Sequence, residues 1–280
     1  SSFFQTLYKK YHSVETGNLV LCLEKNIHLA IIRQREKNIN HDVSLKNFFN
    51  NFSCITKPAQ KICNIVENTG IPKETTRRKI KKLIKINLVK YNQNNKDYYW
   101  NPLCESKDSY TKITENEIKI LSKFIFACLT NLGINSNLRS INYEVERQYS
   151  FYWYHFLSSQ LKWLKMWQTE IKDIDLIFIA IEALIPTLQY RNKSALKNID
   201  VNELHLIIGK TNKDYKTSKN TVSANSISQI SGIPRATCIR KLKKLMDLGM
   251  LCKEIKSKRY FINSYTDGRT KHIVKKDTLN

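Results

Sequence analysis

Two stretches of the chain are near copies of each other, and this internal repeat constrains the fold more than any other feature. Residues 70–89, GIPKETTRRKIKKLIKINLV, align without a gap on residues 232–251, GIPRATCIRKLKKLMDLGML. The match continues downstream, where residues 98–101 (YYWN) align on residues 260–263 (YFIN). A segment that recurs only once, far downstream of the first copy, indicates two similar domains rather than a solenoid.

Each copy contains residues that end one helix and begin the next. Gly70 and Gly232 stand where a tight turn between helices needs a positive φ. Pro72 and Pro234 follow two residues later. Proline is tolerated at a helix start because the N–H that it lacks would have no partner there. Each copy therefore predicts a helix, a glycine turn and a second helix.

The second helix of each copy is predicted to be amphipathic and strongly basic. Its apolar positions recur at i, i+4 and i+7, which indicates a narrow buried stripe: Thr76, Ile80 and Leu83 in the first copy, and Cys238, Leu242 and Leu245 in the second. A short apolar strand follows at residues 88–89 and 250–251, before a polar turn and an aromatic or β-branched strand. This order predicts a β-hairpin after each basic helix.

Helix, glycine turn, basic helix and hairpin form the order of a winged helix-turn-helix. The second copy, ISQISGIPRATCIRKLKKLMDLGML with its basic hairpin, closely resembles the DNA-binding domain of bacterial MarR- and IclR-type transcription regulators. The first copy, Ile65 to Trp100, resembles it with one departure: Asn87 replaces Gly249, which usually closes the recognition helix, and asparagine tolerates the same left-handed conformation. The resemblance implies a mainly α fold with small β-hairpin wings: two tandem winged helix-turn-helix repeats, each preceded by packed helices.

The charge of the chain favours a polyanionic partner. Formal net charge is +23 at pH 7. An AT-rich genome alone would favour lysine and asparagine, but it would spread the charge evenly along the chain. Instead, residues 70–96 carry +8 and residues 232–259 carry +7, so that +15 of the +23 lies in these two stretches. The charge is concentrated on the elements expected to meet phosphate.

The face of each basic helix opposite its apolar stripe is predicted to contact DNA. A helix in the major groove reads base edges from its first turns; Arg pairs with guanine, and Thr and Ile contact thymine methyl groups. The candidate base-reading residues are Lys73, Thr75, Arg77, Arg78 and Lys81 in the first copy, and Arg235, Thr237, Ile239, Arg240 and Lys243 in the second. The candidate phosphate contacts on the helix flank and the wing are Lys82, Lys85, Lys244, Lys96, Lys256, Lys258 and Arg259.

The two predicted reading helices are not equivalent. Arg77 stands opposite Ile239 in the alignment, and Glu74 stands opposite Ala236. A symmetric dimer reads a palindrome, whereas two unlike copies in one chain should read an asymmetric site. We therefore expect a covalent pseudo-dimer, in which the linkage raises the effective concentration of the second helix.

The repeat predicts the domain organisation. Upstream of the copies, residues 18–34 can be laid on residues 175–191, both as apolar helices, and residues 44–52 on residues 202–208 as the first helix of each winged domain. We expect repeat A at residues 1–105 (motif about 58–101), a connecting helix within residues 106–144, repeat B at residues 145–265 (motif about 202–263), and a polar basic tail at residues 266–280. Residues 210–221 are predicted to form an exposed insertion loop. Thr114-x-x-Glu117 has the form of a capping box and predicts a helix from Thr114 to about Leu132.

Three of the four tryptophans lie in one aromatic segment, residues 149–167. One face of this predicted helix holds Trp153, Leu157, Leu161, Leu164 and Trp167. Large aromatic side chains dominate cores and interfaces, so the segment indicates a buried core helix or a homodimer interface. A pocket for a small effector and stacking against single-stranded nucleic acid are the alternatives.

Other chemistry finds little support in the sequence. The six histidines show no HxxxH or HxH spacing, and there is no GxGxxG, GxxxxGK[ST] or GxSxG motif. The seven scattered cysteines form no CxxC pair, which favours reduced, mostly buried thiols. The most apolar segment, residues 174–188, is interrupted by charges and Pro186 and is too short to span a bilayer. We expect no enzymatic activity, no cofactor, no metal and no membrane partner.

These observations favour a sequence-specific protein that binds double-stranded DNA: a bacterial or phage transcription regulator, cytoplasmic and nucleoid-associated. One alternative is a plasmid- or phage-type replication initiator, since some initiators also carry two winged helices. The other is a tandem winged-helix module that binds RNA or a protein partner. Protein-binding winged helices usually lose the basic reading helix, which both copies keep here, so RNA is the stronger form of that alternative.

Overall fold

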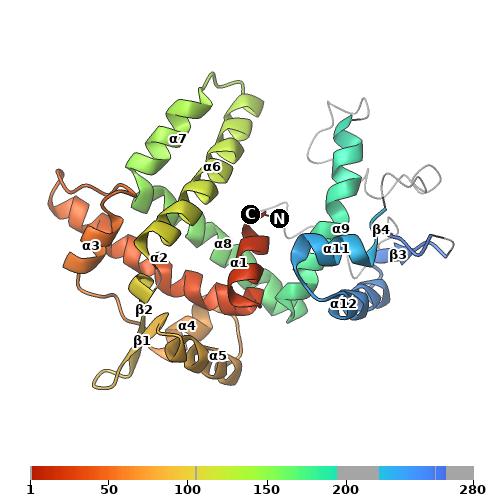
Figure 1. Ribbon diagram of the computed structural model, residues 1–280, viewed down its shortest axis with the longest axis horizontal. Helices are drawn as coiled ribbons and strands as arrows, with labels where there is room; N and C mark the ends of the chain where they lie inside the picture. Colours follow the sequence, from red (N-terminus) through yellow and green to blue (C-terminus); the bar gives the residue numbers. More distant parts are fainter. Residues whose placement is uncertain (1, 105, 194–220, 256, 263–280) are drawn as a thin grey trace. The chain divides into compact units, whose positions relative to one another are not determined.

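The computed structural model describes residues 2–104, 106–193, 221–255 and 257–262 (Figure 1). In these parts the chain is mainly helical, with two small antiparallel sheets of two strands each. Several predicted elements lie outside the described residues: the first helix of the second winged domain (residues 202–208), Lys256 and the tail at residues 266–280. Of the predicted insertion loop, residues 210–221, only Thr221 is described.

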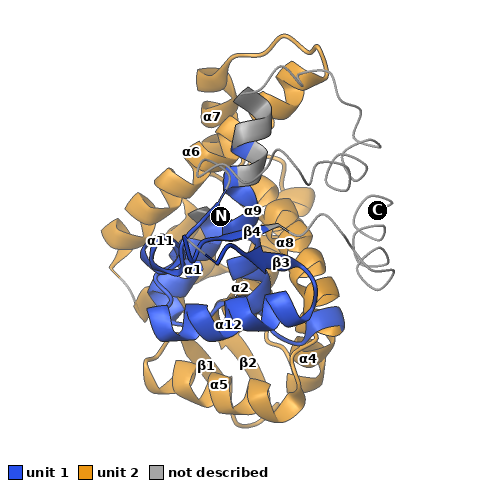
Figure 2. Cartoon of the chain, turned by 90° about the vertical axis from the view of Figure 1, so that its right-hand side faces the viewer, with its two compact units in different colours: residues 1–14, 170–280 blue, residues 15–169 orange. Residues whose placement is uncertain are grey.

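The chain divides into two compact units whose boundaries differ from those we expected (Figure 2). Unit 1 comprises residues 1–14 and 170–280, and unit 2 comprises residues 15–169. The N-terminal helix, which the sequence places in repeat A, belongs to the unit that holds the second copy. The aromatic helix, which the sequence places in repeat B, falls almost entirely in the unit that holds the first copy. The repeat therefore marks similar sequences but not the limits of the compact units.

Unit 2 contains a set of helices and the first hairpin. In chain order its elements are α2 (Val14–Lys37), α3 (Phe48–Cys54), α4 (Ile62–Thr69), α5 (Lys73–Lys85), β1 (Val89–Asn92), β2 (Asp97–Trp100), a short 3-10 helix (Pro102–Cys104), α6 (Lys107–Asn131), α7 (Leu138–Arg147) and α8 (Tyr149–Ile171). Its core contains an aromatic cluster: the ring of Phe48 stacks on Tyr110 at 5.4 Å and meets the edge of Tyr149 at 5.7 Å. The hydroxyls of Tyr110 and Tyr149 share a buried hydrogen bond of 2.9 Å. Aromatic rings thus join α3, α6 and α8, and the ring of Trp100 at the end of β2 lies 6.2 Å from that of Phe48.

Unit 1 combines the N-terminal helix with the second copy. Its elements are α1 (Ser2–Tyr11), α9 (Ile174–Lys193), α11 (Ala224–Ser231), α12 (Arg235–Asp247), β3 (Leu251–Lys253) and β4 (Tyr260–Ile262). Phe4 and Leu7 of α1 are buried, and the ring of Phe4 lies 5.9 Å from that of Phe178 on α9. The core of the unit therefore depends on a helix that is distant in sequence from its other elements.

Residues 60–100 and 222–262, here called segment A and segment B, have the same backbone features at matching positions of the alignment. Their hairpins pair in the same register, from Val89 with Trp100 and from Leu251 with Ile262. Isolated bridges join residue 60 to 98 and residue 222 to 260. Left-handed residues recur at Gly70 and Gly232, at Asn87 and Gly249, and at Lys96 and Lys258, with φ between 53° and 75°. The left-handed conformation expected of Asn87 is confirmed.

The buried stripes predicted for the basic helices are confirmed. In α5, Thr76, Ile80 and Leu83 are at most 2% exposed, and in α12 Cys238, Leu242 and Leu245 are fully buried. Gly70 and Gly232 end α4 and α11, and α5 and α12 each begin one residue after the proline. The local signals in the sequence therefore describe these elements well.

The upstream match between long helices has a different register from the one we expected. Left-handed His12 and Lys172, with φ of 52° and 56°, each precede a long helix, which begins at Val14 in α2 and at Ile174 in α9. These starts place Asn18 opposite Phe178, whereas laying residues 18–34 on 175–191 places Asn18 opposite Asp175. Because this shift of three residues is close to one helical turn, it nearly preserves an apolar stripe, and the pattern alone does not separate the two registers.

The connecting segment is also different in detail. Residues 106–144 were expected to hold one helix from Thr114, but α6 begins at Lys107, where the Ser106 side chain accepts a hydrogen bond from the Ser109 backbone N–H. Thr114 lies inside this helix and is buried, so the capping box predicted there is wrong. The helix extends upstream because Ser106 provides an earlier N-cap. A second helix, α7, packs against α6.

The aromatic segment forms α8, and its apolar face is buried as predicted. Trp153, Leu157, Leu161, Leu164 and Trp167 are at most 8% exposed. Within unit 2, the Trp153 indole donates a hydrogen bond of 3.0 Å to the Glu24 carboxylate on α2. This face is therefore part of the core, and the homodimer expected through residues 149–167 stays a prediction.

Candidate nucleic-acid interface

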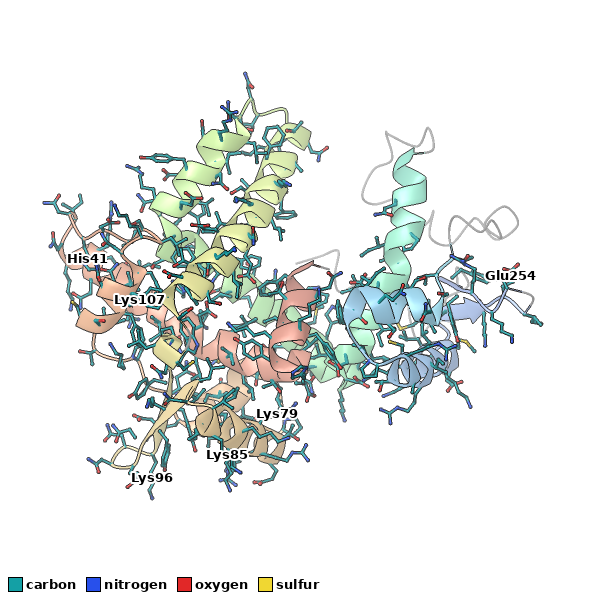
Figure 3. All side chains as sticks on the ribbon, viewed as in Figure 1. His41, Lys79, Lys85, Lys96, Lys107 and Glu254 are labelled. Atoms are coloured by element: carbon teal, nitrogen blue, oxygen red, sulfur yellow. The ribbon has the colours of Figure 1, made fainter. Side chains whose placement is uncertain are left out.

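Segment A exposes a strongly basic helix face. The stripe of α5 faces the core, so the other side of the helix faces solvent and carries the cations. Among the predicted site residues, Lys73, Arg77, Arg78 and Lys81 are exposed, and Thr75 is half-buried. The flank residues Lys82 and Lys85 are exposed as well, and Figure 3 marks Lys85 near the end of the helix. The helix thus presents a continuous set of Lys and Arg side chains to solvent.

Segment B exposes an equivalent face with a different composition. Arg235, Arg240 and Lys243 are exposed on α12, Thr237 is half-buried, and Lys244 is exposed on the flank. Ile239 is 38% exposed at the position that Arg77 occupies in segment A. The two helices therefore share cations at three matching base-reading positions and differ at the position of Ile239.

The hairpin tips carry cations at matching places. Lys96 and Lys258 are both exposed and both left-handed, and Figure 3 shows Lys96 at the tip of its hairpin. Arg259, by contrast, is half-buried and donates hydrogen bonds to Thr221, at 2.8 Å to the hydroxyl and 3.0 Å to the carbonyl. Arg259 therefore stabilises segment B itself, and its contact with phosphate stays a prediction.

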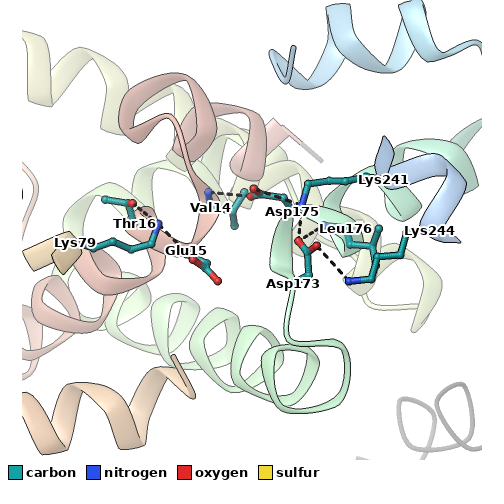
Figure 4. A network of polar contacts seen from close by, with 9 residues as sticks. All are labelled: Val14, Glu15, Thr16, Lys79, Asp173, Asp175, Leu176, Lys241 and Lys244. Atoms are coloured by element: carbon teal, nitrogen blue, oxygen red, sulfur yellow. Dashed lines mark hydrogen bonds and ion pairs between the residues drawn. The ribbon is translucent and has the colours of Figure 1, made fainter. Parts of the chain in front are cut away.

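Two lysines that sequence reasoning left out anchor the basic helices (Figure 4). Lys79 on α5 lies 3.3 Å from the Glu15 carboxylate and donates a hydrogen bond of 3.1 Å to the Thr16 hydroxyl, both at the start of α2. Lys241, at the matching position on α12, contacts Asp173 at 2.6 Å and Asp175 at 3.9 Å, at the start of α9.

The side chains of Lys79 and Lys241 are only 16% and 12% exposed, so these lysines do not belong to the solvent face. The sequence did contain a signal for this role: both copies have a lysine one residue before a buried position of the stripe. The role was not predicted because the acidic partner of each lysine lies far from it in sequence.

A groove of about 660 Å³ runs beside α5. Its basic lining residues are Arg77, Arg78, Lys81, Lys82 and Lys85, and the others are Glu74, Ile80 and Ile84 of the helix and Tyr98 of β2. Arg77 forms an ion pair of 2.5 Å with Glu74, one turn before it on the helix. Burial, followed by the neighbouring Tyr91, raises the pKa of Tyr98, while Arg77 lowers it. Tyr98 therefore stays a neutral O–H donor at physiological pH, within a groove suited to an anionic ligand.

The glycine turns are covered by helices from different parts of the chain. A Cβ placed on Gly70 would lie 3.6 Å from the side chains of Gln168 and Lys165 on α8. A Cβ placed on Gly232 would lie 3.7 Å from the ring of Tyr8 on α1. Both supporting helices directly precede a long helix that starts after a left-handed residue. Each segment is thus held at its turn and at its anchoring lysine.

Other chemical sites are sparse in the part of the chain that the structure describes. It contains no group of three or more His, Cys, Asp or Glu side chains that could hold a metal ion. The expectation of mostly buried thiols is wrong, since only Cys22 and Cys238 of the seven cysteines are buried. No described helix combines the length and the apolar character needed to cross a bilayer.

Comparison of the chain with protein-family models, curated proteins and solved structures finds no match. The functional assignment therefore depends on the geometry and chemistry of segments A and B.

Proposed function

We propose that the protein binds double-stranded DNA sequence-specifically and regulates transcription, using two winged helix-turn-helix domains that arose by duplication. Segments A and B are these domains, α5 and α12 are their recognition helices, and the hairpins are their wings. The support is the agreement of element order, hairpin register and left-handed positions between the segments. The same order underlies the resemblance to MarR- and IclR-type domains.

The observation that carries the proposal is the solvent face of α5 and α12. Exposed cations stand at three matching base-reading positions: Lys73 and Arg235, Arg78 and Arg240, and Lys81 and Lys243. Each helix is fixed on its other side by the buried stripe and by Lys79 or Lys241. A rigid helix with an outward cationic face fits the major groove, where Arg and Lys read guanine and phosphates hold the register.

The chain acts as a covalent pseudo-dimer in this proposal. Each chain contains two recognition helices, so it needs no second copy to contact two half-sites. The helices differ at Arg77 and Ile239 and at Glu74 and Ala236. The preferred DNA is therefore asymmetric, with one half-site read by a helix richer in arginine and the other by a helix with an exposed isoleucine.

A salt titration tests the proposal. If each domain neutralises about four to five phosphates, the logarithm of affinity for duplex DNA should fall with the logarithm of salt concentration with a slope of about −7 to −9. The measurement is fluorescence anisotropy with labelled duplex DNA, repeated with a structured RNA hairpin at matched salt. A slope for DNA shallower than about −3 would exclude the basic faces as the contact surface. Tighter binding to the hairpin at every salt concentration would favour the RNA-binding alternative.

A further inference from the structure

The tip of the second hairpin displays one apolar side chain. Ile255 is 92% exposed, the highest value for any large hydrophobic residue that the structure describes. Isolated exposed hydrophobic residues are common on protein surfaces, so exposure alone indicates nothing. The surroundings of Ile255 distinguish it from an isolated surface residue.

Hydrogen bonds between residues on the two sides of Ile255 close the hairpin. The Glu254 backbone N–H donates a hydrogen bond of 2.9 Å to the Arg259 carbonyl, which closes the hairpin across the tip. The Ser257 hydroxyl donates to the Glu254 carboxylate, and the Arg259 backbone N–H donates to the Ser257 hydroxyl at 3.3 Å. Figure 3 shows Glu254 at the base of this turn. The turn projects Ile255 away from the core without any buried contact for its side chain.

Cations flank Ile255 within the same hairpin. Lys253 precedes it by two residues and is exposed, and Lys258 follows it by three residues and is exposed with φ of 55°. An apolar tip between two cations suits a narrow groove with phosphate walls and stacked bases at its floor. The minor groove of B-DNA has this form, and proteins that bind there insert apolar side chains between base steps, which unstacks the bases and bends the duplex.

We propose that Ile255 is an apolar wedge, which enters the minor groove beside the half-site of α12 and bends the duplex there. This inference depends on the proposed function, because it assumes that segment B binds DNA. The matching residue of segment A is the exposed Gln93, which is flanked by the exposed Asn94 and Asn95. A polar amide does not act as a wedge, so the bend belongs to the half-site of segment B alone.

The experiment uses the full chain and a duplex recovered by selection from a random pool. Paired fluorophores at the duplex ends report bending, and 2-aminopurine placed at successive steps reports unstacking. The wild-type protein should bring the ends together and raise the 2-aminopurine signal at one step near the segment B half-site. Ile255→Gln, which installs the residue of the other hairpin, should lose both signals but keep salt-dependent binding. The matched control Gln93→Ala should keep both.

The outcomes separate the inference from the proposed function. Both substitutions change exposed side chains, so unchanged circular dichroism and thermal unfolding are expected for both. If the wild type and Ile255→Gln bind and bend the duplex equally, the wedge is refuted while DNA binding stands. If the wild-type protein shows no salt-dependent affinity for any duplex, both the wedge and the proposed function are refuted.

Discussion

Segments A and B have matching backbone features but expose different side chains to solvent. Their hairpin registers and left-handed residues coincide, and a lysine at the same position anchors each basic helix to the start of a long helix. Among the exposed residues, Arg77 aligns with Ile239, and Gln93 aligns with Ile255. The comparison shows that the residues fixing the helix are repeated, whereas several residues available to a ligand have diverged.

The largest expected effect concerns the support of segment B. Leu7 lies on α1 of unit 1 and is 5% exposed in the whole chain, so Leu7→Ala should cost about 2–5 kcal/mol of stability. Hydrogen exchange should accelerate in α11 and α12 and stay unchanged in α4 and α5. The control Leu132→Ala makes the same change at a residue that is 73% exposed and should change neither. Faster exchange in segment A alone would show that α1 does not support segment B.

The anchoring lysines should differ in strength. Lys241 lies 2.6 Å from Asp173, whereas Lys79 lies 3.3 Å from Glu15, and Lys241 is the less exposed of the two lysines. Lys241→Met should therefore destabilise its segment more than Lys79→Met does. Hydrogen bonds to charged partners contribute about 1.5–3 kcal/mol, and both pairs are partly buried. Thermal unfolding of the single variants and of a double-mutant cycle with Asp173→Asn measures this. Lys243→Met, on the exposed face, is the matched control, and an equal loss for it would contradict the anchoring role.

Base reading and phosphate contact should separate in segment B. Arg240→Ala should cost about 1–3 kcal/mol on the preferred duplex and relax preference at one base pair, because Arg240 is exposed on the recognition helix. Lys258→Ala, at the hairpin tip, should weaken binding to all duplexes alike. Binding to specific and random duplexes at one salt concentration gives both values. If both variants lose equal affinity on both duplexes, the assigned roles are wrong.

The smallest effect concerns pH and unit 2. His28 is fully buried beside Phe48 and Tyr149, and burial lowers its pKa below the usual 6.5 while Glu24 opposes the shift. The folded state therefore keeps His28 neutral, and the unfolded state binds more protons below about pH 6.5. The contribution of neutral His28 to the free energy of unfolding is fully present above that pH and is lost as the pH falls. The loss is at most about 1.4 kcal/mol per pH unit.

The variant His28→Phe removes this titration and keeps an aromatic ring at the site. As the pH falls from about 7.5 to 5, the wild type should therefore lose unfolding free energy relative to the variant. A difference that is constant over this range would show that His28 does not titrate on unfolding. Within the described residues unit 1 buries no histidine, so hydrogen exchange should increase in unit 2 first.

Much of segments A and B could be predicted because their signals are local. A glycine before a proline, an i, i+4, i+7 stripe and a polar turn each determine the conformation of a few neighbouring residues. The exposed placement of Arg78 and Arg240 follows directly from the stripe on the opposite side of each helix. The bonds of Arg259 within segment B were not predicted, because its partner Thr221 lies far from it along the chain.

The compact units and the anchoring lysines Lys79 and Lys241 could not be predicted, because they depend on contacts between residues that are far apart in the sequence. The support of Gly232 by Tyr8 joins residues that are far apart in the chain, and nothing near either residue signals it. The register of α2 against α9 was misplaced by three residues because an apolar pattern repeats at nearly that interval. The start of α6 was missed because Thr114 resembles an N-cap as closely as Ser106 does.

The central claim is that one chain reads DNA with two unlike recognition helices, and selection of binding sites from a random duplex pool tests it most directly. The account predicts an asymmetric consensus with two different half-sites. It also predicts that Ile239→Arg shifts one half-site from thymine towards guanine, since it replaces a methyl contact with a bidentate donor. A perfect palindrome would mean that one helix reads DNA twice in a homodimer, and a pool without enrichment would contradict sequence-specific binding altogether.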